Sequence, residues 1–169
     1  MDIALLIIRL VVGLGFAAHG AQKLFGWFGG HGIAGTGGFF ESIGFRPGKL
    51  FATAAGLSEL VGGLLLALGL GGPIAATFVI AVMVVATLGV HLRNGFFAMN
   101  NGYELAVLYA AVAAVFAFVG YGAYSIDAAA GWSGVWTPAL DAAFVGLGVL
   151  GGLVNLAARR KPAETAAQS

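Results

Sequence analysis

Apolar residues run through this chain in five long stretches, which short polar or glycine-rich segments separate. A helix needs about 20 mostly apolar residues to cross a bilayer. The stretches cover residues 3–24, 50–70, 73–91, 103–119 and 138–158. Pro73 and Pro138 begin two of them, where the missing N–H of proline costs a first helical turn nothing. The pattern therefore predicts five transmembrane helices followed by a polar tail at 159–169.

The composition supports an integral membrane protein. Hydrophobic residues make up 60% of the 169 positions and charged residues only 9%, whereas soluble domains carry about 25% charged residues. A soluble domain of this length could not bury so much apolar surface. We therefore expect an all-α membrane helical bundle, with the lipid bilayer as its surroundings and no nucleic-acid partner.

The residue types present limit the chemistry that the chain can perform. It contains no cysteine, which excludes thiolate catalysis, iron–sulfur clusters and cysteine-bound zinc. No group of carboxylates has the spacing of a metal site, so we expect no metal. Redox chemistry would therefore require a bound cofactor or a partner protein.

The loop charges predict an orientation. Seven of the eight Lys and Arg residues lie in the loops, in the tail or at the end of an apolar stretch. They are Lys23, Arg46, Lys49, Arg93, Arg159, Arg160 and Lys161. Five crossings place all seven on one side, and loop cations favour the cytoplasmic side. We expect the N-terminus outside and the C-terminus in the cytoplasm, because four crossings would separate Lys23 from the basic tail.

Two ionisable residues lie deep inside apolar stretches, Arg9 in the first and Glu59 in the second. Each costs about 2.5–3.5 kcal/mol to insert, which makes such residues functional candidates. At 1.5 Å per residue, Arg9 lies roughly 9 Å and Glu59 roughly 17 Å below the outer end of its stretch. Long side chains can close most of that difference, so we expect a structural Arg9–Glu59 ion pair. Two alternatives are that Glu59 relays a proton to a ligand and that Arg9 extends alone toward the outer surface.

A second set of polar residues gathers where three of the stretches meet the cytoplasmic side. The set comprises His19, Gln22, Lys23, His91 and Glu104. The first three share one helix face, at spacings of three and four residues. With Glu59 they form the predicted ligand-binding set, in which His19 and Glu59 are the catalytic candidates.

Each member of this set also has a structural interpretation. Lys23 and His91 suit the negative C-terminal ends of their helices, and Asn101 with Glu104 resembles a capping box. His19 has no capping role, and packing and ligand contact are equally open for it. His19 and His91 could in principle ligate a haem, but no haem attachment motif is present, so haem is not expected. The glycine-rich segment 26–44 is expected to lie at the membrane interface.

Six segments together resemble the DoxX family of small bacterial membrane proteins. They are "RLVVGLGFAAHGAQKLFGWFGG", "GTGGFFESIGF", "GLSELVGGLLLALGL", "HLRNGFF", "NGYELAVLYAA" and "YSID", between about residues 9 and 127. The resemblance implies a four-helix membrane core over 1–127 in the bacterial cytoplasmic (inner) membrane, with 138–158 as an additional helix. It also carries over a polar set consisting of Arg9, His19, Lys23, Glu59, His91 and Glu104.

The resemblance implies a role next to redox enzymes, because DoxX-like proteins are linked to quinone-coupled oxidation of sulfur compounds and to membrane-associated redox complexes. We therefore expect a membrane subunit that binds a quinone between its helices, with other membrane or redox subunits, or a second copy of the chain, as partners. His19 and Lys23 would donate hydrogen bonds to a quinone carbonyl, and Glu59 or Glu104 would supply protons. The alternative is a non-catalytic scaffold that docks and stabilises a partner complex.

Overall fold

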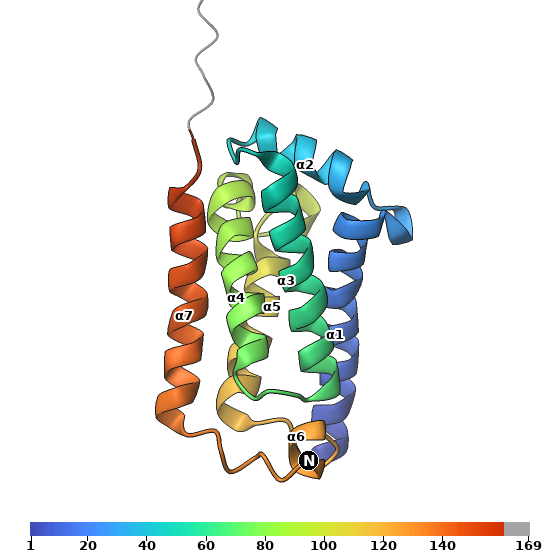
Figure 1. The fold of residues 1–169 in the computed structure, drawn as a ribbon, viewed down its shortest axis with the longest axis vertical. Coiled ribbons are helices and arrows are strands. Elements are labelled where there is room, and N and C mark those ends of the chain that lie inside the picture. The colour runs from blue at the N-terminus through green and yellow to red at the C-terminus, as the bar shows by residue number, and fades with distance from the viewer. Residues whose placement is uncertain (161–169) are drawn as a thin grey trace, which may run out of the picture.

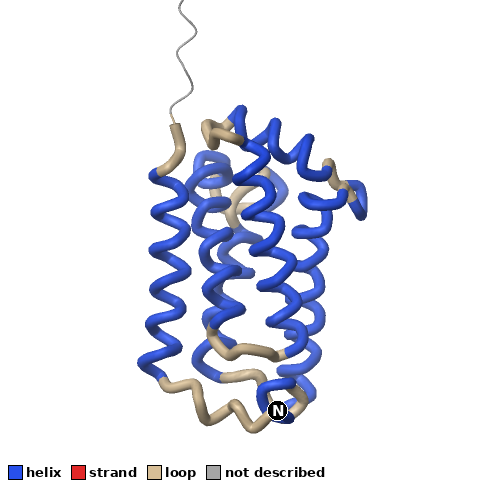
Figure 2. The backbone as a smooth tube through the Cα atoms, viewed as in Figure 1, coloured by secondary structure: helices blue, strands red, loops and turns tan. Residues whose placement is uncertain are grey.

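Seven α-helices make up most of the computed structural model, which describes residues 1–160 (Figures 1 and 2). They are α1 Asp2–Phe25, α2 Gly32–Ser42, α3 Gly48–Leu68, α4 Ile74–Ala86, α5 Glu104–Val119, α6 Ile126–Ala129 and α7 Pro138–Ala157. The described residues contain no strand, so the predicted all-α bundle is confirmed. Of the predicted polar tail, residues 161–169 lie outside the described part of the chain.

Five helices, α1, α3, α4, α5 and α7, run along the long axis of the bundle, and α2 lies across one end (Figure 1). Four helical segments are long and apolar enough to cross a membrane: Asp2–Phe25, Gly48–Leu68, Ile74–Asn94 and Pro138–Ala157. The protein is therefore a multi-pass membrane protein. Helix α5 is apolar but has only 16 residues, or about 24 Å at 1.5 Å per residue. Because that is less than the hydrocarbon thickness of about 30 Å, the fifth crossing stays a prediction.

The antiparallel helices α1 and α3 approach each other at glycine positions. A Cβ atom on Gly20 would lie 2.4 Å from the backbone nitrogen of Leu60, and one on Gly63 would lie 2.4 Å from that of Ala17. Helices in lipid associate through such close backbone contacts, because apolar side chains gain little by leaving a hydrocarbon solvent. These contacts set the stagger of the two helices and place Glu59 level with the last two turns of α1.

Helix α7 packs along α4 through small residues. A Cβ atom on Gly152 would lie 2.6 Å from the Cβ of Val84, and the Thr77 hydroxyl donates to the backbone carbonyl of Phe144 at 2.8 Å. Just past the C-terminal end of α7, the backbone N–H of Arg160 donates to the Gly44 carbonyl at 2.8 Å. The additional C-terminal helix is therefore fastened to the bundle at several levels.

Helix α2 differs in part from the interfacial segment expected at 26–44. Phe40, Ile43 and Phe45 are buried in a cluster with α3, whereas Phe39 is exposed. Glu41 is also exposed, and its carboxylate accepts from the Gly48 N–H at 3.0 Å at the start of α3. The segment is thus a short helix that covers the end of the bundle and contributes its aromatic side chains to the core.

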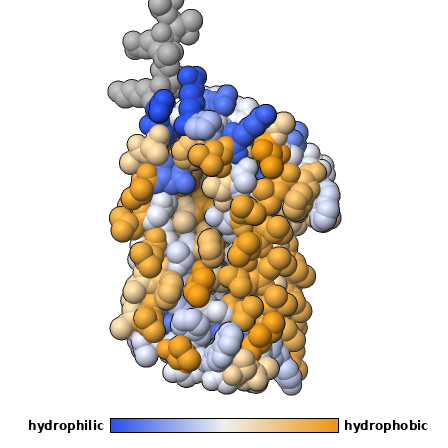
Figure 3. Space-filling view, in the orientation of Figure 1, coloured by the Kyte–Doolittle hydropathy of each residue, from blue (hydrophilic) through white to orange (hydrophobic). Residues whose placement is uncertain are grey.

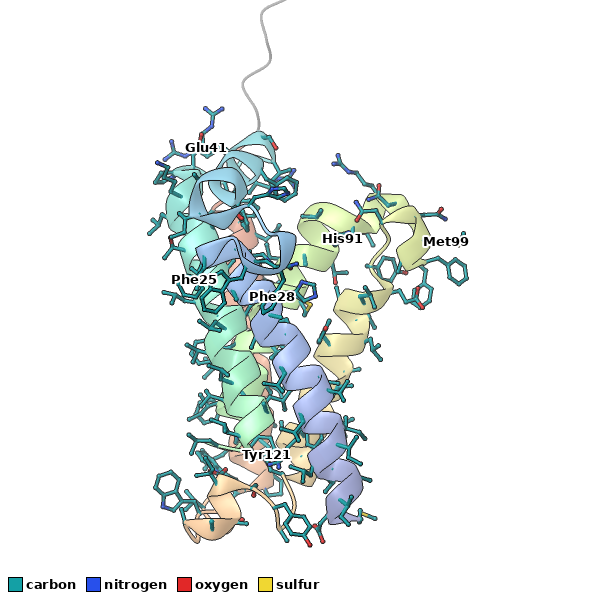
Figure 4. The ribbon with its side chains drawn as sticks, turned by 90° about the vertical axis from the view of Figure 1, so that its right-hand side faces the viewer. Phe25, Phe28, Glu41, His91, Met99 and Tyr121 are labelled. Atoms are coloured by element: carbon teal, nitrogen blue, oxygen red, sulfur yellow. The ribbon has the colours of Figure 1, made fainter. Side chains whose placement is uncertain are left out.

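The surface of the bundle is apolar along its length. Figure 3 shows hydrophobic side chains over most of the visible face and strongly hydrophilic ones at the end from which the C-terminal tail leaves. Phe25 and Phe28 lie toward that end and Tyr121 at the opposite one (Figure 4). We call the end with the tail the inner end and the end with α6 the outer end, following the predicted orientation.

Candidate functional site

An ion pair lies inside the inner half of the bundle. Lys23 Nζ on α1 donates to Glu59 Oε2 on α3 at 2.6 Å. The Glu59 side chain is only 3% exposed, while that of Lys23 is 27% exposed. A carboxylate removed from water is costly unless a cation compensates it, and Lys23 supplies that compensation.

The structure corrects the expected Arg9–Glu59 pair, because Glu59 pairs with Lys23. The depth estimate assumed that the first two helices end in the same plane. In the structure, the glycine contacts place Gly13 against Ala67 and Gly20 against Leu60, so α1 extends well beyond the outer end of α3. Arg9 consequently lies beside Gly69, one residue past that end.

Arg9 belongs to the outer end, where it is 1% exposed. Its guanidinium donates to the backbone carbonyl of Tyr124 and lies 5.7 Å from the ring centroid of Tyr121. It does not extend alone to the surface, because it is buried under the loop that follows α5. The polar residues that the family resemblance implied are therefore divided between the two ends of the molecule.

Two cavities adjoin the Lys23–Glu59 pair. One, of about 520 Å³, lies among α2, α3, α4 and α7, and the other, of about 280 Å³, lies among α1, α4 and α5. The residues common to both linings are Lys23, Glu59, Ala86, His91 and Asn101. The ion pair and His91 thus stand at the boundary between the two cavities.

His19 lines the smaller cavity and is itself exposed, so this cavity opens to the surface of the bundle. The Gln22 amide nitrogen donates to the Phe28 carbonyl at 3.1 Å, which turns the amide oxygen toward His19 Nδ1 at 3.0 Å. That network assigns the proton to Nδ1 and leaves Nε2 as an acceptor. The ring meets Tyr109 edge-on at 6.1 Å between centroids. Gln22 is absent from both cavity linings and acts by orienting His19.

His91 reaches the cavities because the helix changes its winding. After Ala86 the chain forms a π-helical turn over Thr87–His91, a feature that often accompanies functional sites. His91 Nδ1 lies 2.7 Å from the backbone carbonyl of Asn101, so Nδ1 is the donor and Nε2 is left as an acceptor. Both histidines therefore have one ring nitrogen committed to the protein and one without such a partner.

Glu104 does not line either cavity, and the capping box expected with Asn101 does not form. Its carboxylate accepts from the backbone N–H of Ala98 at 2.8 Å, and Tyr103 occupies the cap position of α5 without a side-chain bond. The reason is local, since Asn101 has a left-handed backbone with φ of 58° and belongs to the preceding turn. The structure supports a role in loop folding for Glu104.

Sequence reasoning missed two polar residues of the smaller cavity, Tyr109 and Asn101. A tyrosine within an apolar helix needs a polar environment for its hydroxyl, and that requirement is the signal that could have found Tyr109. Asn101 faces the cavity through an irregular turn that no helical pattern describes. Among residues 1–160, no group of three metal-binding side chains lies together.

Comparisons with known proteins show which family and which relative this chain resembles. A family model described as DoxX matches residues 4–92. An uncharacterized protein of Haemophilus influenzae is 35% identical over 123 residues, which cover 71% of this chain and 85% of that protein. No solved structure matches the chain. The segment that the family model matches includes the Lys23–Glu59 pair, His19 and His91, whereas Tyr109 and Glu104 lie beyond it.

Proposed function

The chain belongs to the DoxX family of membrane proteins, and on that premise we propose that it is a quinone-binding subunit of a membrane redox system. The observation that carries the proposal is the buried Lys23–Glu59 pair at the boundary of two cavities. Ligand sites are typically cavities of about 300–1,000 Å³ with apolar walls and a few converging polar groups. The inner end of this bundle has those properties.

The smaller cavity suits the head group. A quinone carbonyl needs hydrogen-bond donors, and the Lys23 ammonium and the Tyr109 hydroxyl both line the cavity. The reduced form instead presents hydroxyl donors, for which His19 Nε2 and His91 Nε2 are acceptors. One set of side chains thereby matches both oxidation states of the same ring.

The larger cavity suits the beginning of an isoprenoid tail. Apolar side chains of α2, α3 and α4 form much of its wall, including Phe39, Phe51, Val82 and Val85. A quinone with its ring beside His19 would extend its tail past the ion pair into this volume. The exposure of His19 provides an approach from the lipid side of the bundle.

The chain supplies binding and protons, and a partner supplies electrons. Reduction of a quinone takes up two electrons and two protons, and the sequence has no cysteine to hold an iron–sulfur cluster. A reduced partner protein with a bound redox cofactor would deliver the electrons. Lys23 and Glu59 are the groups placed to pass protons from the inner surface to the ring oxygens.

We further propose that the inner end faces the cytoplasm of a bacterium and that the N-terminus lies outside. The basis is the common side that five crossings give to the loop cations. A reporter fused after residue 169 should then read as cytoplasmic and one inserted at 128–130 as external. Two reporters on the same side would contradict the five-crossing topology.

The test of function is quinone binding by the purified full-length chain in lipid nanodiscs. Ubiquinol-1, the reduced form, should bind saturably, and His19→Leu should weaken its binding by about tenfold or more, the equivalent of one well-oriented hydrogen bond from a quinol hydroxyl to Nε2. His31→Leu is the matched control, because His31 is an exposed histidine that lines neither cavity. Wild-type binding no stronger than that of empty nanodiscs, or equal binding by both variants, would overturn the proposal.

A further inference from the structure

A second polar pocket lies at the outer end, far from the proposed quinone site. It has a volume of about 130 Å³ and lies among the end of α5, the loop that follows it and the first turn of α7. Its polar lining residues are Tyr121, Asp127, Ser133, Trp136 and Asp141. A volume of this size holds a few water molecules or a small ion with part of its hydration shell.

Asp141 has no partner for one of its oxygens. The residue is 6% exposed, and its Oδ1 atom is buried without a hydrogen bond. Buried polar groups in folded proteins are nearly always hydrogen-bonded, so each exception needs an explanation. The start of a helix favours an acidic residue, but the cap of α7 is provided by Thr137, whose hydroxyl accepts from Leu140 N–H at 3.4 Å. The Oδ1 atom of Asp141 therefore has no hydrogen-bonded role in capping the helix.

Among the described residues, Asp141 has no full positive charge beside it in the pocket, although the free N–H groups at the start of α7 contribute partial positive charge. The pocket is also lined by the last turn of α5, where terminal carbonyls lack helical partners and carry partial negative charge. The second carboxylate, Asp127, is already compensated by three donors, the N–H groups of Gly71 and Gly72 and the Trp136 indole, at 2.8, 2.7 and 3.0 Å. Within the described part of the chain, no Lys, Arg or His lines the pocket.

We propose that this pocket binds a small monovalent cation at Asp141, as a site independent of the quinone site. Its donors are the Asp141 carboxylate, the Ser133 hydroxyl and the carbonyl end of α5, all of them hard oxygen atoms. One uncompensated carboxylate matches one positive charge, whereas divalent ions take several carboxylates or many oxygen ligands. Sodium, potassium and ammonium ions share the required chemistry.

Trp136 provides a direct reporter, because it lines the pocket and bonds to Asp127. In a Trp27→Phe, Trp132→Phe background it is the only tryptophan of the three in the chain. The full-length protein in detergent is titrated with NaCl, KCl or NH₄Cl, which replace choline chloride at constant ionic strength. We expect a saturable change in Trp136 fluorescence and a higher unfolding temperature with at least one of the three ions.

Asp141→Asn should weaken that response by about tenfold or more, since a charge-assisted contact is lost. Asp2→Asn is the control, because Asp2 lies at the same end but outside the pocket, where its oxygen accepts from Ala123 N–H at 3.0 Å. It should titrate as the parent does. If Asp141→Asn does not fold, Asp141→Glu, which keeps the charge, should retain the response with altered affinity.

Three results would overturn the proposal. The first is a response to none of the three ions beyond that to choline. The second is an Asp141→Asn protein that titrates like its parent, and the third is a response to calcium alone. Binding of ubiquinol-1 is a separate measurement, so either proposal can fail without the other.

Discussion

Apart from Asp141, the buried charges at the two ends of the bundle have different kinds of partner. At the outer end, Arg9 donates to the Tyr124 carbonyl and Asp127 accepts from the Gly71 and Gly72 N–H groups. At the inner end, Lys23 and Glu59 satisfy each other through side chains at 2.6 Å. The outer charges therefore hold loops against helices, while the inner charges hold only each other.

This difference distinguishes charges that stabilise the fold from charges that are available to a ligand. A side chain bonded to backbone can exchange its partner only if the loop moves, so such a contact fixes a fold. A side-chain pair at the boundary of two cavities can exchange a partner for a ligand atom without unfolding anything. Buried charge in a membrane protein is thus a poor guide to function until its partners are known.

The largest effect is expected at Asp127, where removal of the carboxylate leaves three donors without partners. Asp127→Ala should lower the free energy of unfolding by roughly 4 kcal/mol or more, since bonds to charged groups contribute about 1.5–3 kcal/mol each. Thermal unfolding in detergent measures it. Asp2→Ala removes one exposed contact and should lower the free energy of unfolding far less. Similar losses in the two variants would contradict the proposal that Asp127 stabilises the fold at the outer end.

A smaller effect, and an asymmetric one, is expected at the inner pair. Lys23→Met leaves the buried Glu59 carboxylate uncompensated and should cost about 3–5 kcal/mol. Glu59→Gln should cost less, because Lys23 is partly exposed and can extend toward water. The double variant Lys23→Met with Glu59→Gln should recover much of the loss. Additive losses in this double-mutant cycle, measured by thermal unfolding, would show that the two residues do not interact.

Tyr121 offers a test by pH. It lies outside the spanning helices and donates to the Gly72 carbonyl, and burial raises its pKa, with Asp127 adding to the rise. Because the folded protein holds this proton more tightly, Tyr121 stabilises the fold below the unfolded pKa of about 10, and that contribution falls as the pH rises above it. Tyr121→Phe should cost about 1 kcal/mol at neutral pH and should flatten the alkaline decline in unfolding temperature. If the alkaline decline in unfolding temperature is unchanged in Tyr121→Phe, a group other than Tyr121 causes it.

The smallest effect is expected at His31, which lines neither the two inner cavities nor the outer pocket. It is exposed and provides no side-chain cap at the start of α2. His31→Ala should change the free energy of unfolding by no more than about 0.5 kcal/mol. A chemical denaturation curve provides the measurement. A larger loss would mean that the inner polar set extends beyond the residues that line the cavities.

The sequence by itself determined the class of protein and the positions of its long helices, but not those of the short helices α2 and α6. Predicted stretches 50–70 and 138–158 correspond to Gly48–Leu68 and Pro138–Ala157, because the length and apolar character of a spanning helix are local properties. It also singled out His19, Lys23, Glu59 and His91, which line the inner cavities, because polar residues within or at the ends of apolar stretches stand out without knowledge of the fold.

The tertiary structure alone decided which of these residues meet. The partner of Glu59 depends on the stagger of α1 against α3, which is set by glycine contacts between residues about 40 positions apart in the chain, such as Gly20 and Leu60. The π-helical turn at Thr87–His91 and the left-handed Asn101 likewise have no periodic signal. Whether a buried charge stabilises a loop or lines a cavity depends on its neighbours, and the packing of the helices determines which residues those are.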